Sequence, residues 1–234
     1  MSTALTEVPG WYIEFQAALL RQAPRPGEID QTTAEGWTSN QKGLKKNLAG
    51  CLLPPTPSIL ELVSTIVVNA TTGKFVAKEK FVRDTGCKAK VKISYLGDNF
   101  TEWFLFSGSG KTEDPTSEQT LRYHKLRKSS VDGPIITEIG GEEKSETTLT
   151  EMFFLMEKQG NGEAGVLLNN GYVNIFYIRD QKGVLRAVNV RWFGGGWRVL
   201  AGSVENPSRW DDGDQVFSRN SVLESSGPSA PAQA

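Results

Sequence analysis

The segment that most limits how this chain can fold is residues 191–220, which contains three of the six tryptophans. Tryptophan is large and amphipathic, so each ring either fills a core or stands at an interface. Three consecutive glycines, 194–196, break any regular element, and the neighbouring arginines and aspartates rarely become fully buried unless they are paired. The segment therefore predicts a hairpin and loops that are held by tryptophans, with the other side chains facing water.

The amino-acid composition and net charge limit the kinds of partner that the chain is expected to bind. The chain has 234 residues, 38% hydrophobic and 23% charged, which is typical of a globular protein with a sizeable core. Its net charge of -1 provides no basic field, so we expect neither nucleic acid nor a membrane as a partner. No leader pattern or membrane-spanning apolar run occurs, which favours a cytoplasmic location. Cys51 and Cys87 lie in unrelated contexts and predict neither a disulfide framework nor a metal set.

Residues 1–57 are predicted to be a helical segment and linker. Residues 11–22 place apolar side chains on one helical face, and prolines and a glycine follow directly. Residues 27–37 predict a linker. Ser39 is a candidate cap for a second short helix, which would end before the prolines at 54, 55 and 57.

Residues 58–128 are predicted to form an antiparallel β region. Segments 60–68 and 74–82 are rich in β-branched and apolar residues and flank the turn sequence NATTG, so they predict a hairpin. Segments 90–95 and 100–106 predict a second hairpin. Connections this short favour an antiparallel sheet with one buried face.

The sequence SGSGKT at residues 107–112 matches a phosphate-binding P-loop only in part. The glycine that the motif requires five residues before Gly110 is replaced by Leu105, and Pro115 follows where a helix should begin. We therefore expect a glycine–serine turn without nucleotide binding. His124 is the only histidine and is expected on the surface of a strand, since one histidine cannot form a multi-histidine metal site.

Residues 129–221 are predicted to be an α+β region. Thr148 and Glu151 have capping-box spacing, and apolar residues at 149, 152, 153 and 156 repeat with the helical period. The segments beyond predict strands, with a bulge or two-sided burial around residues 184–192. Residues 222–234 are small, polar and proline-rich, which predicts a disordered tail. The predicted fold class is α+β, mostly antiparallel β with a few short helices.

The run TTLTEMFFLMEKQGNGEAGVLLNNGYVNIFYIRDQKGVLRAVNV, followed by a Trp/Gly/Asp-rich segment ending in QVFSRN, resembles uncharacterised proteins of uncultured, small-genome bacteria. In these proteins the segment before VFSRN is similar to the variable region of a diversity-generating retroelement target. In such systems a reverse transcriptase copies a template with errors at adenines. Asparagine codons then become many other codons, but not those of Trp, Gln, Lys, Met or Glu. The resemblance covers about residues 90–221.

The residues between 192 and 215 fit that rule. The resemblance implies a ligand-binding set whose members can all be reached from asparagine codons: Phe193, Gly194, Gly195, Gly196, Arg198, Leu200, Gly202, Ser208, Arg209, Asp211, Asp212 and Asp214. It implies a fixed structural frame of Trp192, Trp197 and Trp210, together with Glu205 and Gln215. Targets of this kind present their variable residues on a C-type-lectin-like fold, so the resemblance implies that fold for the C-terminal part.

Two short motifs resemble the calcium site of C-type lectins incompletely. The order Glu205–Asn206–Pro207 differs from the lectin order Glu–Pro–Asn. The carboxylates from Asp211 to Asp214 lack the spacing of a calcium loop, which needs about six or more converging oxygens. We therefore expect no metal, and nothing in the sequence indicates a cofactor.

The favoured hypothesis is a non-enzymatic recognition protein whose residues 191–215 bind a protein or other macromolecular ligand. One alternative is a fixed structural or assembly scaffold without a variable ligand. Another is a carbohydrate-active enzyme that uses tryptophan faces with two of Asp211, Asp212 and Asp214. Glycoside hydrolysis needs two carboxyl groups about 5 to 9 Å apart in different environments, whereas these lie almost adjacent in the sequence. We therefore expect the protein not to be an enzyme.

Overall fold

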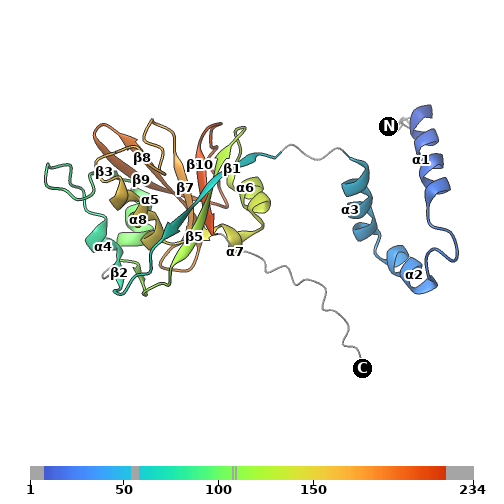
Figure 1. Cartoon of the computed structure of the whole chain (residues 1–234), viewed down its shortest axis with the longest axis horizontal. Coiled ribbons are helices and arrows are strands. Elements are labelled where there is room, and N and C mark those ends of the chain that lie inside the picture. The colour runs from blue at the N-terminus through green and yellow to red at the C-terminus, as the bar shows by residue number, and fades with distance from the viewer. Residues whose placement is uncertain (1–7, 54–57, 107, 109, 220–234) are drawn as a thin grey trace, which may run out of the picture. The chain divides into compact units, whose positions relative to one another are not determined.

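The structure is a computed structural model that describes residues 8–53, 58–106, 108 and 110–219 (Figure 1). The chain divides into two compact units, Met1–Pro57 and Ser58–Ala234. The regions predicted as 58–128 and 129–221 lie in one unit, because strands from both pair in a single sheet. The tail predicted over 222–234 lies outside the described residues.

The described part of the first unit consists of three helices: α1 (Gly10–Gln22), α2 (Gln31–Ser39) and α3 (Gln41–Leu52). The helix predicted over 11–22 is confirmed as α1. No residue of these three helices is buried. Across both units, no helix of the described residues combines the length and the apolar character needed to cross a bilayer.

The start points of α2 and α3 differ from the prediction. The linker predicted over 27–37 is wrong in its second half, because the Asp30 carboxylate accepts a 2.8 Å hydrogen bond from the backbone N–H of Thr33. That contact satisfies a free donor of the first turn and begins α2 there. Ser39 ends α2, and its neighbour Asn40 caps α3 instead.

The Ser58–Ala234 unit is organised around one mixed sheet. Its strands, in spatial order, are β1 (Leu60–Val68), β5 (Gln119–Leu126), β10 (Gln215–Arg219), β7 (Asn174–Arg179), β8 (Leu185–Phe193), β9 (Gly196–Ser203) and β3 (Ile93–Leu96). A further strand, β6 (Glu146–Thr147), pairs with β7. The β10–β7, β9–β3 and β6–β7 pairs are parallel and the others are antiparallel. The predicted class, α+β with mostly antiparallel strands, is confirmed.

Helices cover the sheet on both faces. The first face packs against α4 (Ala77–Lys80), α5 (Asp98–Phe100), the π-helix η1 (Thr101–Leu105) and α8 (Leu149–Lys158). The second face packs against α6 (Asp132–Ile139), and the short helix α7 (Glu142–Ser145) follows it. The buried residues between the sheet and the helices on its first and second faces form a first and a second core. Along β8, Val188 lies in the first core and Ala187 in the second, so the two-sided burial expected there is confirmed.

Helix α8 is the element whose local signals were strongest, and it is confirmed. The Thr148 hydroxyl accepts a 3.1 Å hydrogen bond from the N–H of Glu151. The Glu151 carboxylate accepts a 2.7 Å bond from the N–H of Thr148, which completes the capping box. The apolar residues predicted to share one face of this helix lie in the first core.

The hairpin predicted from segments 60–68 and 74–82 is wrong. Strand β1 pairs with β5, while β2 (Phe75–Val76) pairs with β4 (Thr112–Glu113) and α4 begins directly after β2. The sequence AKEK consists of strong helix formers, and one helical turn there lets both Phe75 and Phe81 enter the first core.

The strand predicted over 100–106 is helical instead, because α5 and η1 occupy residues 98–105. Phe100 and Phe104 are both fully buried, with their rings stacked 5.1 Å apart. Their separation of four residues places them on one face of a helix, whereas the strand prediction rests on the apolar residues of this segment and the turn before it. Strand β3 therefore has no hairpin partner after it and pairs with β9.

Candidate binding surface

Strands β8 and β9 form a tight hairpin within the tryptophan-rich segment. Phe193 pairs with Gly196, and the two residues between them, Gly194 and Gly195, have φ values of 62° and 80°. Two successive positive φ angles match the right-handed twist of a hairpin and are adopted readily only by glycine and a few other residues. The first two glycines thus form the turn, while the third, Gly196, is buried.

The tryptophans of this hairpin lie on its inner face. Trp192 is directly opposite Trp197, and their rings meet edge to face with centroids 5.3 Å apart. Trp197 is fully buried, and its indole N–H donates a 2.9 Å hydrogen bond to the carbonyl of Gln159. Trp192 is partly buried and packs against the same core. Both rings therefore attach the hairpin to the domain.

Alternate residues of the same two strands project to the outer face, since side chains alternate along a strand. Arg191 lies opposite Arg198, and Phe193 follows Arg191 two positions along β8. The Phe193 side chain is 59% exposed, which is unusual for a large aromatic residue. Helix α6 and its core lie on this face of the sheet, but only Leu185 and Ala187 of the hairpin belong to that core.

Aromatic rings surround the two arginines. The Arg198 guanidinium lies 4.8 Å from the ring centroid of Tyr95, on β3, and 5.8 Å from that of Phe193. Arg191 also lies 5.8 Å from the Phe193 ring. Within the described residues, neither guanidinium group forms a hydrogen bond or an ion pair, and the Nε atom of each is buried without a partner. Tyr95, Arg191, Phe193, Arg198 and Leu200 are called the Arg–aromatic surface below.

The facing arginines of the Arg–aromatic surface lower the stability of the protein when no ligand is bound. Like charges directly opposite each other across two strands destabilise a sheet, and here no neighbouring carboxylate forms an ion pair with either described arginine. Cation–π contacts offset part of that cost. The terminal guanidinium nitrogens, unlike the buried Nε atoms, remain available to a ligand with carboxylate or other acceptor groups.

The loop of residues 204–214 is attached to the domain by Trp210. Its ring is 7% exposed, and the indole N–H donates a 2.7 Å hydrogen bond to the Asp132 carboxylate. The backbone of Trp210 also exchanges hydrogen bonds with that of Ser130. Trp192, Trp197 and Trp210, predicted as the structural frame, thus all make internal contacts.

Asp214 does not lie on the surface, unlike the rest of its predicted ligand-binding loop. It is 4% exposed and accepts 2.9 Å hydrogen bonds from the backbone N–H groups of Val173 and Asp211. Burial raises the pKa of its carboxyl, while the two N–H donors and nearby Arg191 act in the opposite direction. Asp214 therefore shapes the loop from inside, and its predicted contact with ligand is replaced by a structural role.

The other predicted ligand-binding residues divide by exposure. Phe193, Gly194, Gly195, Ser208, Arg209, Asp211 and Asp212 are exposed, and Arg198, Leu200 and Gly202 are partly exposed. Gly196 is buried against Ser94, where an added Cβ would lie 2.9 Å from the backbone nitrogen, so its predicted contact with ligand is wrong. Arg191 is close enough to Asp214 to lower the pKa of that carboxyl, so the hairpin and the loop are electrostatic neighbours. The structure thus places the hairpin part of the predicted ligand-binding set near the part in the 204–214 loop.

Three residues that contribute to this region are absent from the predicted ligand-binding set and frame, although Arg191 lies within the predicted segment 191–215. Tyr95 and Asp132 are separated from the segment by many residues, and nothing local links them to it. Arg191 carried a signal that could have been used, because it precedes Phe193 by two residues and a strand places such residues on one face.

The structure also bears on the other candidate sites. Among residues 8–219, apart from the few that are not described, no three His, Cys, Asp or Glu side chains are grouped as metal ligands. The lysine of the SGSGKT sequence, Lys111, donates a hydrogen bond to the carbonyl of Arg179 and lies 3.7 Å from the Glu113 carboxylate. Its ammonium group is therefore used within the fold.

Comparison of the chain with protein-family models, with curated proteins and with solved structures finds no match.

Proposed function

We propose that the chain is a non-enzymatic recognition protein that binds a protein ligand through the Arg–aromatic surface and the exposed residues of the 204–214 loop. In this proposal the segment is the variable region of a retroelement target, presented on a C-type-lectin-like fold. Protein surfaces offer both the carboxylates and the apolar groups that this mixture of arginine and aromatic side chains would contact.

One observation supports the proposal above the others. Residues assigned to the variable set and to the frame alternate along the hairpin, with Phe193 and Arg198 on the outer face and Trp192 and Trp197 on the inner face. A segment that changes its outer side chains while keeping its inner tryptophans would alter the ligand and retain the core. At these four positions the adenine rule, which concerns codons, and the strand geometry thus agree.

The chemical character of the surface favours a ligand with acidic and aromatic groups. Arginine and large aromatic residues are enriched among the side chains that contribute most to protein–protein binding. The guanidinium of Arg198 lies 4.8 Å from the ring centroid of Tyr95, so a ligand would meet it with part of its side-chain entropy already lost.

The carbohydrate-active alternative has less support. It requires two carboxyl groups among Asp211, Asp212 and Asp214, and Asp214 uses both oxygens to accept backbone hydrogen bonds. The remaining pair are sequence neighbours on an exposed loop. A pair in one exposed environment does not provide the separate acid and base that glycoside hydrolysis needs.

The neighbouring DNA provides the first test. We expect a reverse-transcriptase gene and a near-copy of the segment that encodes residues 191–220. The two copies should differ mainly at template adenines, and the differences should fall in the codons of the outer-face and loop residues. Differences spread evenly over all four bases would contradict the retroelement assignment.

Two matched libraries provide the second test. The first randomises six residues of the outer face and loop: Phe193, Arg198, Leu200, Ser208, Arg209 and Asp211. The second randomises four buried residues of the same strands: Val188, Val190, Val199 and Ala201. We expect most members of the first library to remain folded, because exposed substitutions usually change stability by only about 0.5 kcal/mol.

Selection from the first library against an immobilised acidic protein should yield binders whose sequences differ only at the randomised positions. Buried-library members should mostly unfold, since core substitutions cost about 2–5 kcal/mol each. Equal losses of folded protein in the two libraries would contradict the assignment of the outer face to recognition, as would a first library that folds but yields no binder.

A further inference from the structure

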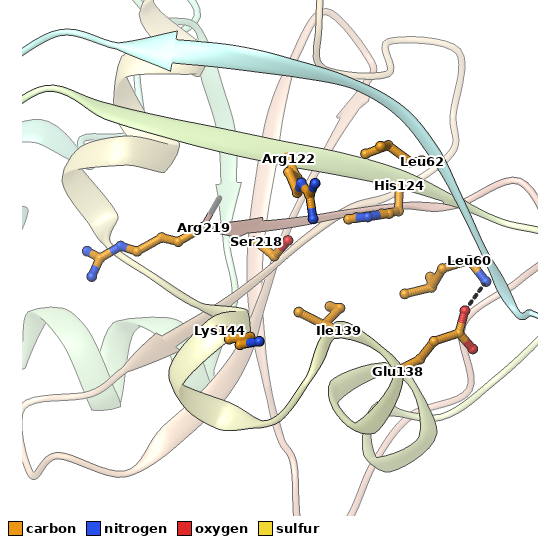
Figure 2. A pocket seen from close by; sticks show the side chains of 9 residues that line it. All are labelled: Leu60, Leu62, Arg122, His124, Glu138, Ile139, Lys144, Ser218 and Arg219. Carbon is orange, nitrogen blue, oxygen red and sulfur yellow. Dashed lines mark hydrogen bonds between the residues drawn. The ribbon is translucent and has the colours of Figure 1, made fainter. Parts of the chain in front are cut away.

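A hollow of about 300 Å³ lies at the end of the sheet away from β3, between strands β1, β5 and β10 and the helices α6 and α7 (Figure 2). It is separate from the Arg–aromatic surface, which involves β3, β8 and β9. Its volume is at the lower end of the range of small-molecule sites, about 300–1,000 Å³.

Basic side chains from two elements face this hollow. Arg122 and His124, two residues apart on β5, project from the same side of the strand, as Figure 2 shows. Lys144 enters from α7 on the opposite side. The register also places Ser218 of β10 directly opposite Arg122, so a hydroxyl lies beside the guanidinium.

The backbone helps to position Lys144. Gly140 has a φ of 111°, and a Cβ atom added there would lie 2.8 Å from Cδ of Lys144. The aliphatic stem of the lysine therefore runs across the glycine, and a side chain at 140 would displace it. This contact restricts where the ammonium group can go.

The positive charges around the hollow are not balanced. Glu138 is the one carboxylate among the lining residues, and its two oxygens already accept hydrogen bonds from the Ser58 hydroxyl and from the backbone N–H groups of Ile59 and Leu60. In the described part of the chain, Arg122 and Lys144 form no ion pair. Arg219, the other cation, pairs with Glu151 and points away from the hollow in Figure 2.

His124 adds an unsatisfied donor or acceptor. Its Nδ1 atom is buried and has no hydrogen-bond partner among the residues that the structure describes, which is uncommon for a buried polar atom. Burial, and then the charge of Arg122, lower the pKa of its imidazole, whereas Glu138 acts in the opposite direction. The imidazole lines the hollow, so its ring signals can report what binds there.

We propose that this hollow binds the oxyanion group of a small molecule, a phosphate, sulfate or carboxylate, through Arg122 and Lys144, with the imidazole of His124 beside it. An anion there would pair with both cations, which form no ion pair among the described residues. Charge-assisted hydrogen bonds of this kind are about twice as strong as neutral ones.

The single histidine provides a direct test, because the untagged protein has one set of imidazole ring signals in its NMR spectrum. Inorganic phosphate, sulfate and succinate are titrated separately at constant ionic strength, with chloride as the compensating salt. We expect a saturable shift of the His124 ring signals with at least one of the three. The tighter of phosphate and succinate then identifies the ligand class as phosphoryl or carboxylate.

Three variants define the site. Arg122→Gln and Lys144→Gln should each weaken binding by roughly ten- to a hundredfold, since each removes a hydrogen bond to a charged group. Lys125→Gln, next to His124 but on the other side of β5, is the matched control and should bind as the parent does. Thermal melts of each variant show that the fold is retained.

The proposal is overturned if the His124 signals move linearly with every salt, including chloride. It is equally overturned if folded Arg122→Gln and Lys144→Gln bind like the Lys125→Gln control. Should one of the two variants fail to fold, the other decides alone, because the two residues lie on different elements.

Discussion

The indole N–H of Trp210 and the hydroxyl of Tyr177 both donate to the same oxygen, Oδ1, of Asp132, at 2.7 and 2.9 Å. The other carboxylate oxygen is buried without a partner. A carboxyl group in the second core of the sheet thus holds the loop that carries Ser208 to Asp212. Burial raises the pKa of the Asp132 carboxyl, while the two hydrogen bonds lower it.

Trp210→Phe should separate the contribution of the hydrogen bond to stability from that of the aromatic ring. Phenylalanine keeps an aromatic side chain but removes a donor to Asp132, so we expect the free energy of unfolding to fall by about 1–3 kcal/mol. Trp210→Ala should cost more, about 3–5 kcal/mol, because it also leaves a cavity. Urea unfolding followed by far-UV circular dichroism measures both. Trp11→Phe, at a residue that is 69% exposed, is the control, and an equal loss there would contradict the prediction.

Asp132→Asn should change how stability depends on pH. Because the folded-state pKa of Asp132 is raised, its contribution to stability is fully present below the unfolded pKa and is lost as pH rises through the folded value. Asparagine does not titrate, so the variant does not lose stability in this way. The free energy of unfolding of the variant should therefore increase relative to that of the parent as pH rises from about 4 to about 8. Urea titrations across that range test this.

The control for this experiment is Asp212→Asn, which removes a carboxyl from the exposed part of the same loop. Its difference from the parent should stay nearly constant over the pH range. If the Asp132→Asn difference is equally flat, burial of the Asp132 charge has no effect on stability and the prediction is wrong.

Asp212→Ala and Asp214→Ala should differ although only one residue separates them. Asp214 accepts two buried backbone hydrogen bonds, and leaving their donors unsatisfied costs about 1–3 kcal/mol. Asp212 is exposed, so its replacement should change stability by about 0.5 kcal/mol or less. Differential scanning calorimetry compares the two melting temperatures. A larger decrease of the melting temperature for Asp212→Ala would contradict the structural role assigned to Asp214.

Gly162→Ala should disturb the ring of Trp192. Gly162 has a φ of 74°, and an added Cβ would lie 2.2 Å from that ring. The control is Gly171→Ala, which has a φ of 96° but open space around the added atom. Forced overpacking costs about 1–3 kcal/mol, so Gly162→Ala should lose about that much more stability than the control in urea unfolding. Equal losses would mean that backbone strain alone accounts for both.

The parts of the fold that follow from neighbouring residues could be predicted from the sequence. The capping box of α8 and the glycine turn of the β8–β9 hairpin involve residues only a few positions apart. The partner of β1 could not be predicted, because β5 lies about sixty residues further along the chain and offers no local signal. The strand predicted over residues 100–106 is wrong for another reason, since short apolar runs fit both the strand and the helix period.

The candidate surface shows the same division. That Trp197 is held inside could be predicted from its residue type, whereas the exposure of Phe193 was implied by the resemblance, and the strand pleat separates the two side chains. The role of Asp214 could not be predicted, because an aspartate next to two exposed aspartates gives no sign that it accepts hydrogen bonds from Val173, on a distant segment. Asp132 was missed for a similar reason, being 78 residues from the Trp210 that it holds.

The position of Arg191 opposite Arg198 also has a kinetic consequence. Two cations held on neighbouring strands make the potential over the outer face of the hairpin more positive, although Asp214 lies near Arg191 and the net charge of the chain is -1. Such a potential accelerates the diffusional encounter with an acidic partner and repels basic ones before contact. Association rates of acidic ligands should therefore fall steeply as ionic strength rises, while dissociation rates change little. The hairpin would then act on the speed of encounter as well as on the final complex.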